Sequence, residues 1–176
     1  MDTTARISGV AIPIAVTPAL AAIRSRWDLA ASQGAEPHVT ILYPFLDEDR
    51  LDGSVRVALT AVAATVEPFD VRFARVQRFD TVVWLDPDPA DPFRALTAAM
   101  AEHWPDHPPY GGVHDEVIPH LTVAEADPAA APFDAIEAAA GDVIPFTSRA
   151  EAMELWLQDD TGHWRPHWRF PLGVRP

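Results

Sequence analysis

The sequence predicts an α+β fold with two pseudo-symmetric lobes of antiparallel sheet, outer helices and a central cleft. Short apolar, β-branched runs alternate with helical patterns. The order strand, helix, strand, helix, strand occurs twice, which indicates two similar lobes. A short polar motif recurs in a corresponding strand of each half. Because 176 residues suffice for one core, we expect residues 1–176 to form a single two-lobed domain.

Several residues of the first half indicate where helices and strands begin and end. Thr17 and Pro18 supply a cap and a first-turn proline for a helix, and Gly34 follows its end. Asp80 joins two strands tightly, which is typical of a hairpin. We therefore expect strands at 7–16, 38–43, 69–79 and 81–85, and helices at 17–32 and about 50–65.

The second half repeats this order. Asp91 and Pro92 begin a helix as Thr17 and Pro18 do, and Asp127 with Pro128 begins the next one. We expect helices at 91–104 and 127–140, a Pro- and Gly-rich loop at 105–113, a strand from 144 that continues to 158, and a last strand at 163–172.

The recurring motif is Pro37-His38-Val39-Thr40-Ile41 in the first half and Pro119-His120-Leu121-Thr122-Val123 in the second. Alternate residues of a strand point to opposite faces, so each His shares a face with its Thr while the apolar residues face a core. A single copy is compatible with an ordinary exposed strand. Two matching copies among only seven His indicate a catalytic pair instead.

Two opposed imidazoles suit the cleavage of a phosphodiester. A pKa near 6.5 allows one His to be neutral and accept a proton while the other is protonated and donates one. The hydroxyls of Thr40 and Thr122 would hydrogen-bond the non-bridging phosphate oxygens. The scheme requires no metal and no cofactor, and the sequence leaves open which His is the base.

The paired motif resembles the signature of the 2H phosphoesterase superfamily, which includes the 2′-5′ RNA ligase-like proteins and cyclic phosphodiesterases. The resemblance covers nearly the whole chain. It implies two lobes with both motifs lining the groove between them. It also implies that His38, Thr40, His120 and Thr122 carry the catalytic roles. Relatives often carry an aromatic residue near the position of Phe79, and a turn like Pro109-Tyr110-Gly111-Gly112 precedes their second motif. The resemblance therefore suggests Phe79 and Tyr110 as substrate-binding residues, although core packing explains each of them equally well.

The composition narrows the class of partner. The chain has no Cys, thirteen Arg and no Lys, which excludes thiolate sites and lysine-based chemistry. A formal charge of −13 disfavours long nucleic acids, whereas a local group of Arg would still hold a small phosphate ester. Pro13 and Pro18 interrupt the only signal-like stretch, and no run spans a membrane. We expect a cytoplasmic monomer.

Other residues form alternative candidate sites. His103, His107, His114 and Asp115 offer enough ligands for a metal ion, although scattered surface His is the simpler interpretation. Two further groups of Arg on strands either hold a nucleotide or protect sheet edges: Arg72, Arg75 and Arg78, and Arg165 and Arg169. A nucleotide-binding protein without turnover is the alternative function, and a metallohydrolase is a second rival.

Overall fold

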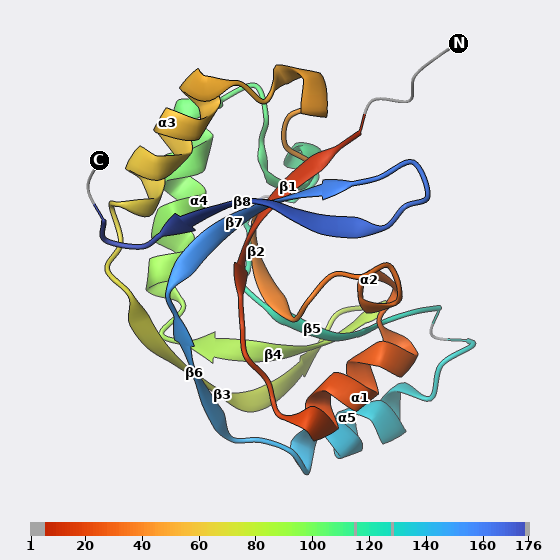
Figure 1. Cartoon of the computed structure of the whole chain (residues 1–176). Helices are drawn as coiled ribbons and strands as arrows, with labels where there is room; N and C mark the ends of the chain where they lie inside the picture. The colour runs from red at the N-terminus through yellow and green to blue at the C-terminus, as the bar shows by residue number, and fades with distance from the viewer. Residues whose placement is uncertain (1–5, 115, 128, 175–176) are drawn as a thin grey trace.

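The structure is a computed structural model that describes residues 6–114, 116–127 and 129–174 (Figure 1). The strands are β1 (Ser8–Pro13), β2 (His38–Leu42), β3 (Phe69–Arg78), β4 (Val82–Asp88), β5 (Leu121–Glu125), β6 (Phe146–Ala150), β7 (Ala152–Gln158) and β8 (Trp164–Pro171). The helices are α1 (Pro18–Trp27), α2 (Leu29–Ser32), α3 (Gly53–Ala63), α4 (Asp91–His103) and α5 (Phe133–Gly141). Two 3₁₀ turns accompany them, η1 (Glu48–Arg50) and η2 (Pro109–Gly112).

The strands form one curled antiparallel sheet in the order β6-β3-β4-β5-β2-β1-β7-β8. Its two halves, β6-β3-β4-β5 and β2-β1-β7-β8, meet where Val39 of β2 pairs with Leu121 of β5. Reversing the order exchanges β2 with β5 and β1 with β4. This arrangement confirms the predicted α+β class with two lobes of antiparallel sheet.

Each lobe takes strands from both halves of the chain. In one lobe, β3 of the first half pairs with β4 of the second half. In the other lobe, β7 of the second half pairs with β1 of the first half. The single strand predicted from 144 to 158 is wrong, because the chain changes lobe at Glu151: β6 pairs with β3 at the sheet edge, whereas β7 runs between β1 and β8. The two segments have different surroundings, since β6 is only partly buried while nearly all of β7 is buried.

Four helices pack on the sheet, two on each lobe. α1 packs against β5 and α5 against β3 and β4, whereas α4 packs against β2 and α3 against β8 (Figure 1). The first strand of each half is thus followed by a helix that lies on the other lobe. Buried Leu20 anchors α1 and buried Phe93, Leu96 and Met100 anchor α4, all at helical spacing.

Two helix boundaries differ from the prediction. The helix expected at 17–32 is interrupted at Asp28, which has an extended backbone, accepts a hydrogen bond from the Ala30 N–H at 3.1 Å and so caps α2. The last helix begins at Phe133 rather than 127, and Pro128 lies outside the described residues. Within the described part of the chain, no helix is both long and apolar enough to cross a membrane.

Candidate active site

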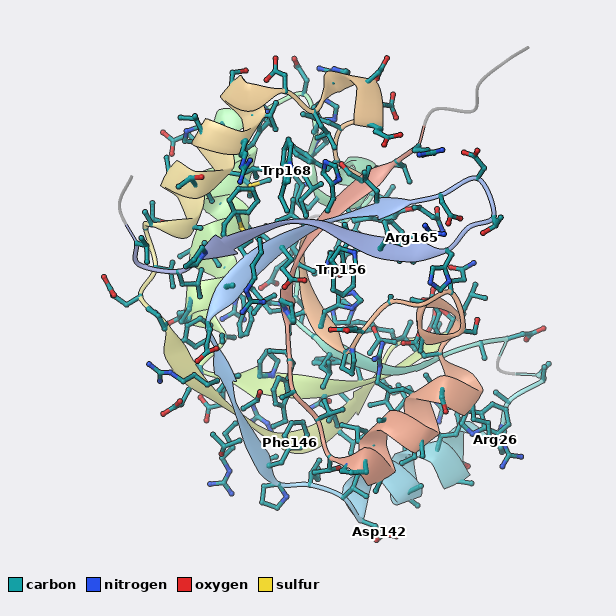
Figure 2. The ribbon with its side chains drawn as sticks, viewed as in Figure 1. Arg26, Asp142, Phe146, Trp156, Arg165 and Trp168 are labelled. Carbon is teal, nitrogen blue, oxygen red and sulfur yellow. The ribbon has the colours of Figure 1, made fainter. Side chains whose placement is uncertain are left out.

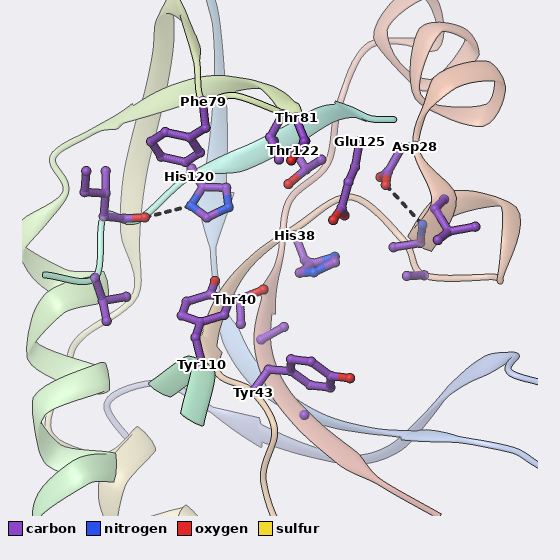
Figure 3. A pocket seen from close by; sticks show the side chains of 18 of the residues that line it. Asp28, His38, Thr40, Tyr43, Phe79, Thr81, Tyr110, His120, Thr122 and Glu125 are labelled. Carbon is purple, nitrogen blue, oxygen red and sulfur yellow. Dashed lines mark hydrogen bonds between the residues drawn. The ribbon is translucent and has the colours of Figure 1, made fainter. Parts of the chain in front are cut away.

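The β2–β5 pair places both motifs on one surface. Val39 and Leu121 are fully buried partners, so their side chains point into the core. Their neighbours along the strands point the opposite way. As a result, His38, Thr40, His120 and Thr122 all line one cleft, as Figure 3 shows.

The cleft has a volume of about 960 Å³, which is at the upper end of the range for small-molecule sites. It runs between the β3–β4 hairpin and the loop before β5 on one side and the α1–α2 junction, β1 and the start of β8 on the other. It therefore has room for a small-molecule ligand.

The two imidazoles are held in the same way. The ring of His38 lies with Nδ1 2.7 Å from the Glu36 carbonyl. The ring of His120 lies with Nδ1 2.7 Å from the Ile118 carbonyl, which Figure 3 shows. A carbonyl oxygen can only accept, so each Nδ1 carries the proton and donates it. In the neutral form each Nε2 is then left without a proton, as a group that exchanges protons with a ligand requires.

Aromatic rings fix the orientation of both imidazoles. Trp156 of β7 meets His38 edge-on at 4.9 Å between ring centroids, and Figure 2 shows this indole in the interior of the molecule. Its Nε1–H donates to Glu154 at 2.8 Å. On the other side, His120 meets Trp84 at 5.8 Å and Phe79 at 5.5 Å. Each imidazole therefore has one edge toward the cleft and an apolar wall behind it.

This enclosure shifts the acid–base properties of both His. The pKa of His38 is lowered to about 4, first because burial disfavours the imidazolium and then through the positive charges of Arg24 and His120. The hydrogen bond to the Glu36 carbonyl opposes the shift. Burial also lowers the pKa of His120, and the Ile118 carbonyl opposes that change. Without a ligand, both rings therefore favour the neutral form.

The two predicted substrate-binding residues also line the cleft. Phe79 follows β3 and stacks on Trp84 at 4.8 Å, so it contributes both to the apolar wall and to the cleft surface. Tyr110 belongs to η2, where it has a φ of 52° and its N–H donates to the Tyr43 carbonyl at 2.6 Å. Burial raises the pKa of the Tyr110 phenol, and a hydrogen bond with the Thr40 hydroxyl partly offsets that effect.

Glu125 is a cleft residue that the sequence pattern did not reveal. Strict alternation from Thr122 would turn Glu125 to the opposite face. The register between β4 and β5 shifts at this point, however, because Trp84 pairs with Thr122 while Val83 pairs with Ala124. The extra residue rotates Glu125 back into the cleft, a common effect of a β-bulge. Burial and then the charge of Asp28 raise the pKa of Glu125.

Two further aromatic residues lie on the His38 side of the cleft. Tyr43 and Trp164 meet edge-on at 5.8 Å and both line the cleft. Gly9 lies directly under Tyr43, where a Cβ would lie 3.3 Å from the ring. Tyr43 follows the end of β2, and Trp164 is contributed by a strand far along the chain, so periodicity gives no indication of either one.

The Arg residues considered as nucleotide ligands are mostly engaged in ion pairs. Arg75 pairs with Asp86, Arg165 with Asp159 at 2.7 Å, and Arg169 with Glu154 at 2.5 Å. Arg72 is exposed on β3. Arg78 lines the cleft, but its guanidinium pairs with Asp134 at 3.0 Å and Glu137 at 3.4 Å.

The His residues proposed as an alternative metal site have separate neighbours. His107 lies 3.3 Å from Arg50, His103 bonds the Ala99 carbonyl at 3.2 Å, and His114 lies against Tyr110. Asp115, the fourth residue of that group, is outside the described residues. Across residues 6–114, 116–127 and 129–174, no three His, Asp or Glu side chains are grouped as metal ligands would be.

The fold and the cleft define the class: a two-lobed α+β protein with a ligand-sized groove between its lobes. The family model described as the 2′-5′ RNA ligase superfamily matches residues 12–162, so the chain belongs to this superfamily. No protein with a curated description matches it.

Solved structures resemble the chain over nearly its whole length. The crystal structure of E. coli LigT complexed with 3′-AMP has a TM-score of 0.57 and 16% identity over 96% of this chain and 98% of that one. The crystal structure of TT0787 of Thermus thermophilus has a TM-score of 0.59 and 16% identity over 97% and 100%. At this identity the likeness is one of fold.

Proposed function

We propose that the chain is a phosphodiesterase that cleaves a small nucleotide or RNA-end phosphodiester, either a 2′,3′-cyclic phosphate or a 2′-5′ linkage. The observation that carries the proposal is the convergence of both His-x-Thr motifs on one cleft, with each Nδ1 bonded to a carbonyl. Membership of a superfamily whose relative LigT was crystallised with 3′-AMP and with phosphate supports a nucleotide ligand.

The mechanism uses the two imidazoles in opposite protonation states. For a cyclic phosphate, the neutral imidazole accepts a proton from water while the water oxygen forms a bond to phosphorus. The bond from phosphorus to the 2′ or 3′ oxygen breaks, and the imidazolium donates its proton to that oxygen. Each transfer contributes a factor of about 10² to 10⁴ in rate. Solvent then restores the two protonation states, and no metal takes part.

The Thr hydroxyls and the aromatic residues position the substrate in this proposal. Thr40 and Thr122 would donate to the non-bridging oxygens and hold phosphorus between the rings. Phe79 and Tyr110 would contact the base or the ribose. The formal charge of −13 favours a small substrate over a long RNA, because non-specific RNA binding requires a basic surface.

The test is hydrolysis of a panel of nucleoside 2′,3′-cyclic phosphates and 2′-5′ dinucleotides in excess chelator. We expect turnover by the wild type and a loss of at least about a hundredfold in His38→Ala and in His120→Ala. His167→Ala is the matched control, because this exposed His on β8 lies outside the cleft. Turnover that requires added metal would favour a metallohydrolase. Saturable binding without product would favour a nucleotide-binding protein.

We also propose that the enzyme acts as a monomer in the cytoplasm. The absence of Cys is compatible with a reducing compartment, and one sequence supplies both His-x-Thr motifs, so the proposed acid–base pair needs no second copy. Sedimentation of the purified protein would reveal a dimer if this expectation is wrong.

A further inference from the structure

A buried ion pair lies behind the second motif. Arg24 of α1 and Asp28 are each only 2% exposed, and Arg24 Nη2 lies 2.5 Å from Asp28 Oδ2. Arg24 Nε–H donates to the Thr122 carbonyl at 2.8 Å. Asp28 Oδ1 also accepts from the Ala30 N–H. The guanidinium thus joins a helix of the first half to the motif strand of the second.

Stability alone does not explain a charge at this position. Replacing a buried ion pair by well-packed apolar residues is often neutral or stabilising, because both ions lose their hydration. Position 24 follows Leu20 at helical spacing on the buried face of α1, where an apolar side chain would suit the pattern. The guanidinium therefore points to a role that an apolar residue would not fill.

The pseudo-symmetry of the fold supplies a counterpart without a charge. The Thr97 hydroxyl of α4 donates to the Ile41 carbonyl of β2 at 3.0 Å. Each helix that follows the first strand of a half is thus bonded to the backbone of the other motif strand. One of these contacts carries a buried positive charge and the other is a neutral hydroxyl.

The charge acts on one His in particular. Arg24 is among the causes that lower the pKa of His38, after burial, whereas burial is what lowers the pKa of His120. Other titratable or charged groups also face the His38 side of the cleft. They are Asp28 beside α1, His120 and Glu125 at β5, Tyr43 after β2, Tyr110 of η2, and Glu154 behind Trp156 of β7.

We propose that Arg24 is a positioning residue for the reaction: it fixes the Thr122 carbonyl and so the second motif strand, and it places a buried positive charge behind the cleft. The inference rests on the proposed function, because it assigns different roles to two His in similar settings. Burial and then the charge of Arg24 disfavour the imidazolium of His38, so His38 is the proton acceptor and His120 is the imidazole that protonates the departing oxygen.

The experiment separates position from charge. Arg24→Met combined with Asp28→Asn removes both charges, so no buried ion is left unpaired, and the amide introduced by Asp28→Asn can still cap α2. Arg24→Lys keeps the charge but loses the planar guanidinium that bonds Thr122 and Asp28 together. Thr97→Val removes the hydroxyl that donates to the Ile41 carbonyl, which is the neutral counterpart of the Arg24 contact. Arg26→Met is the control, because Arg26 lies at the periphery over Trp27 (Figure 2).

The readouts are the pH dependence of kcat/KM and an NMR titration of both imidazoles, which needs no turnover. The double variant should lose between about tenfold and a hundredfold in kcat/KM. Its acid limb and its His38 titration should both move to higher pH, because the charge of Arg24 is among the causes that lower the pKa of His38 and the charge of Asp28 is not. The titration of His120 should hardly move. Arg24→Lys and Thr97→Val should lower the rate without moving the limb, and Arg26→Met should change neither.

Several outcomes would overturn the assignment. A double variant that is less stable but keeps its His38 titration and acid limb would show a purely structural pair. If the double variant fails to fold, an unchanged rate in Arg24→Lys would remove the positioning role. A wild type without turnover would reject the proposed phosphodiesterase, but the NMR titration would still report whether Arg24 acts on His38.

Discussion

The pH dependence of kcat/KM is the sharpest test of the paired-imidazole mechanism. Catalysis requires one imidazole to be neutral and the other protonated in the free enzyme. With the pKa of His38 lowered to about 4 and that of His120 lowered from 6.5, this form is most abundant in the acid range between the two values. We expect a bell-shaped profile with its optimum below 6.5. The optimum is the same whichever His is the base, because the pair titrates as a unit.

The shift of the pH optimum follows from the burial of both imidazoles, which lowers both pKa values. Unperturbed imidazoles would place the optimum near 6.5. With both pKa values lower, at most about one free enzyme molecule in ten keeps the required proton one unit above 6.5, and the rate falls about tenfold for each further unit. The basic limb of kcat should lie at higher pH than that of kcat/KM, because bound phosphate stabilises an imidazolium.

The assay is the initial rate of cyclic-phosphate hydrolysis at low substrate concentration, in buffers of constant ionic strength. NMR titration of the His38 and His120 ring protons in the free protein gives the two pKa values independently. His167→Ala should reproduce the wild-type profile. A kcat/KM optimum at or above neutral pH, or a profile without one of its limbs, would refute the reasoning.

Two further predictions concern the Thr hydroxyls of the cleft and the backbone at Gly34. Thr40→Val and Thr122→Val keep the side-chain shape and remove a hydroxyl, so kcat should fall by about tenfold to a hundredfold while thermal stability changes little; unchanged kcat in both would remove the hydroxyls from the mechanism. Gly34 has a φ of +88°, and a Cβ there would lie 2.2 Å from Cε1 of His163. Gly34→Ala should therefore lower the free energy of unfolding by about 1–2 kcal/mol or more, measured by urea denaturation. Adding His163→Ala should recover only the part due to the clash, and full recovery would show that the backbone conformation contributes nothing.

The sequence was most informative where local pattern and tertiary structure agree. Strand alternation was enough to place each His beside its Thr, since Val39 and Leu121 are fully buried. The duplication of the motif was enough to predict that the two strands share a cleft. The cap and proline at Thr17 and Pro18 located the start of α1 correctly, because this signal depends only on neighbouring residues.

The sequence was least informative where pairing between distant segments decides which residues are buried, which face the cleft and where a strand ends. Arg24 and Asp28 look like an ordinary i, i+4 surface pair, and only the contact of α1 with β5 shows that they are buried. The bulge that turns Glu125 into the cleft depends on the register with β4, which alternation within β5 does not reveal. The break at Glu151 depends on which neighbour each segment pairs with, so the sequence predicts one strand where the structure has two.

The exchange of strands between the lobes has a consequence for how the protein forms during synthesis. β2 is made soon after β1, but β1 obtains its second neighbour only when β7 has been made, after most of the other described strands. Until then one edge of β1 has no partner, and the Trp156 that supports His38 has not been made. The His38 side of the cleft is therefore completed only after β7 has been made, whereas the β4–β5 pair beside His120 can form earlier.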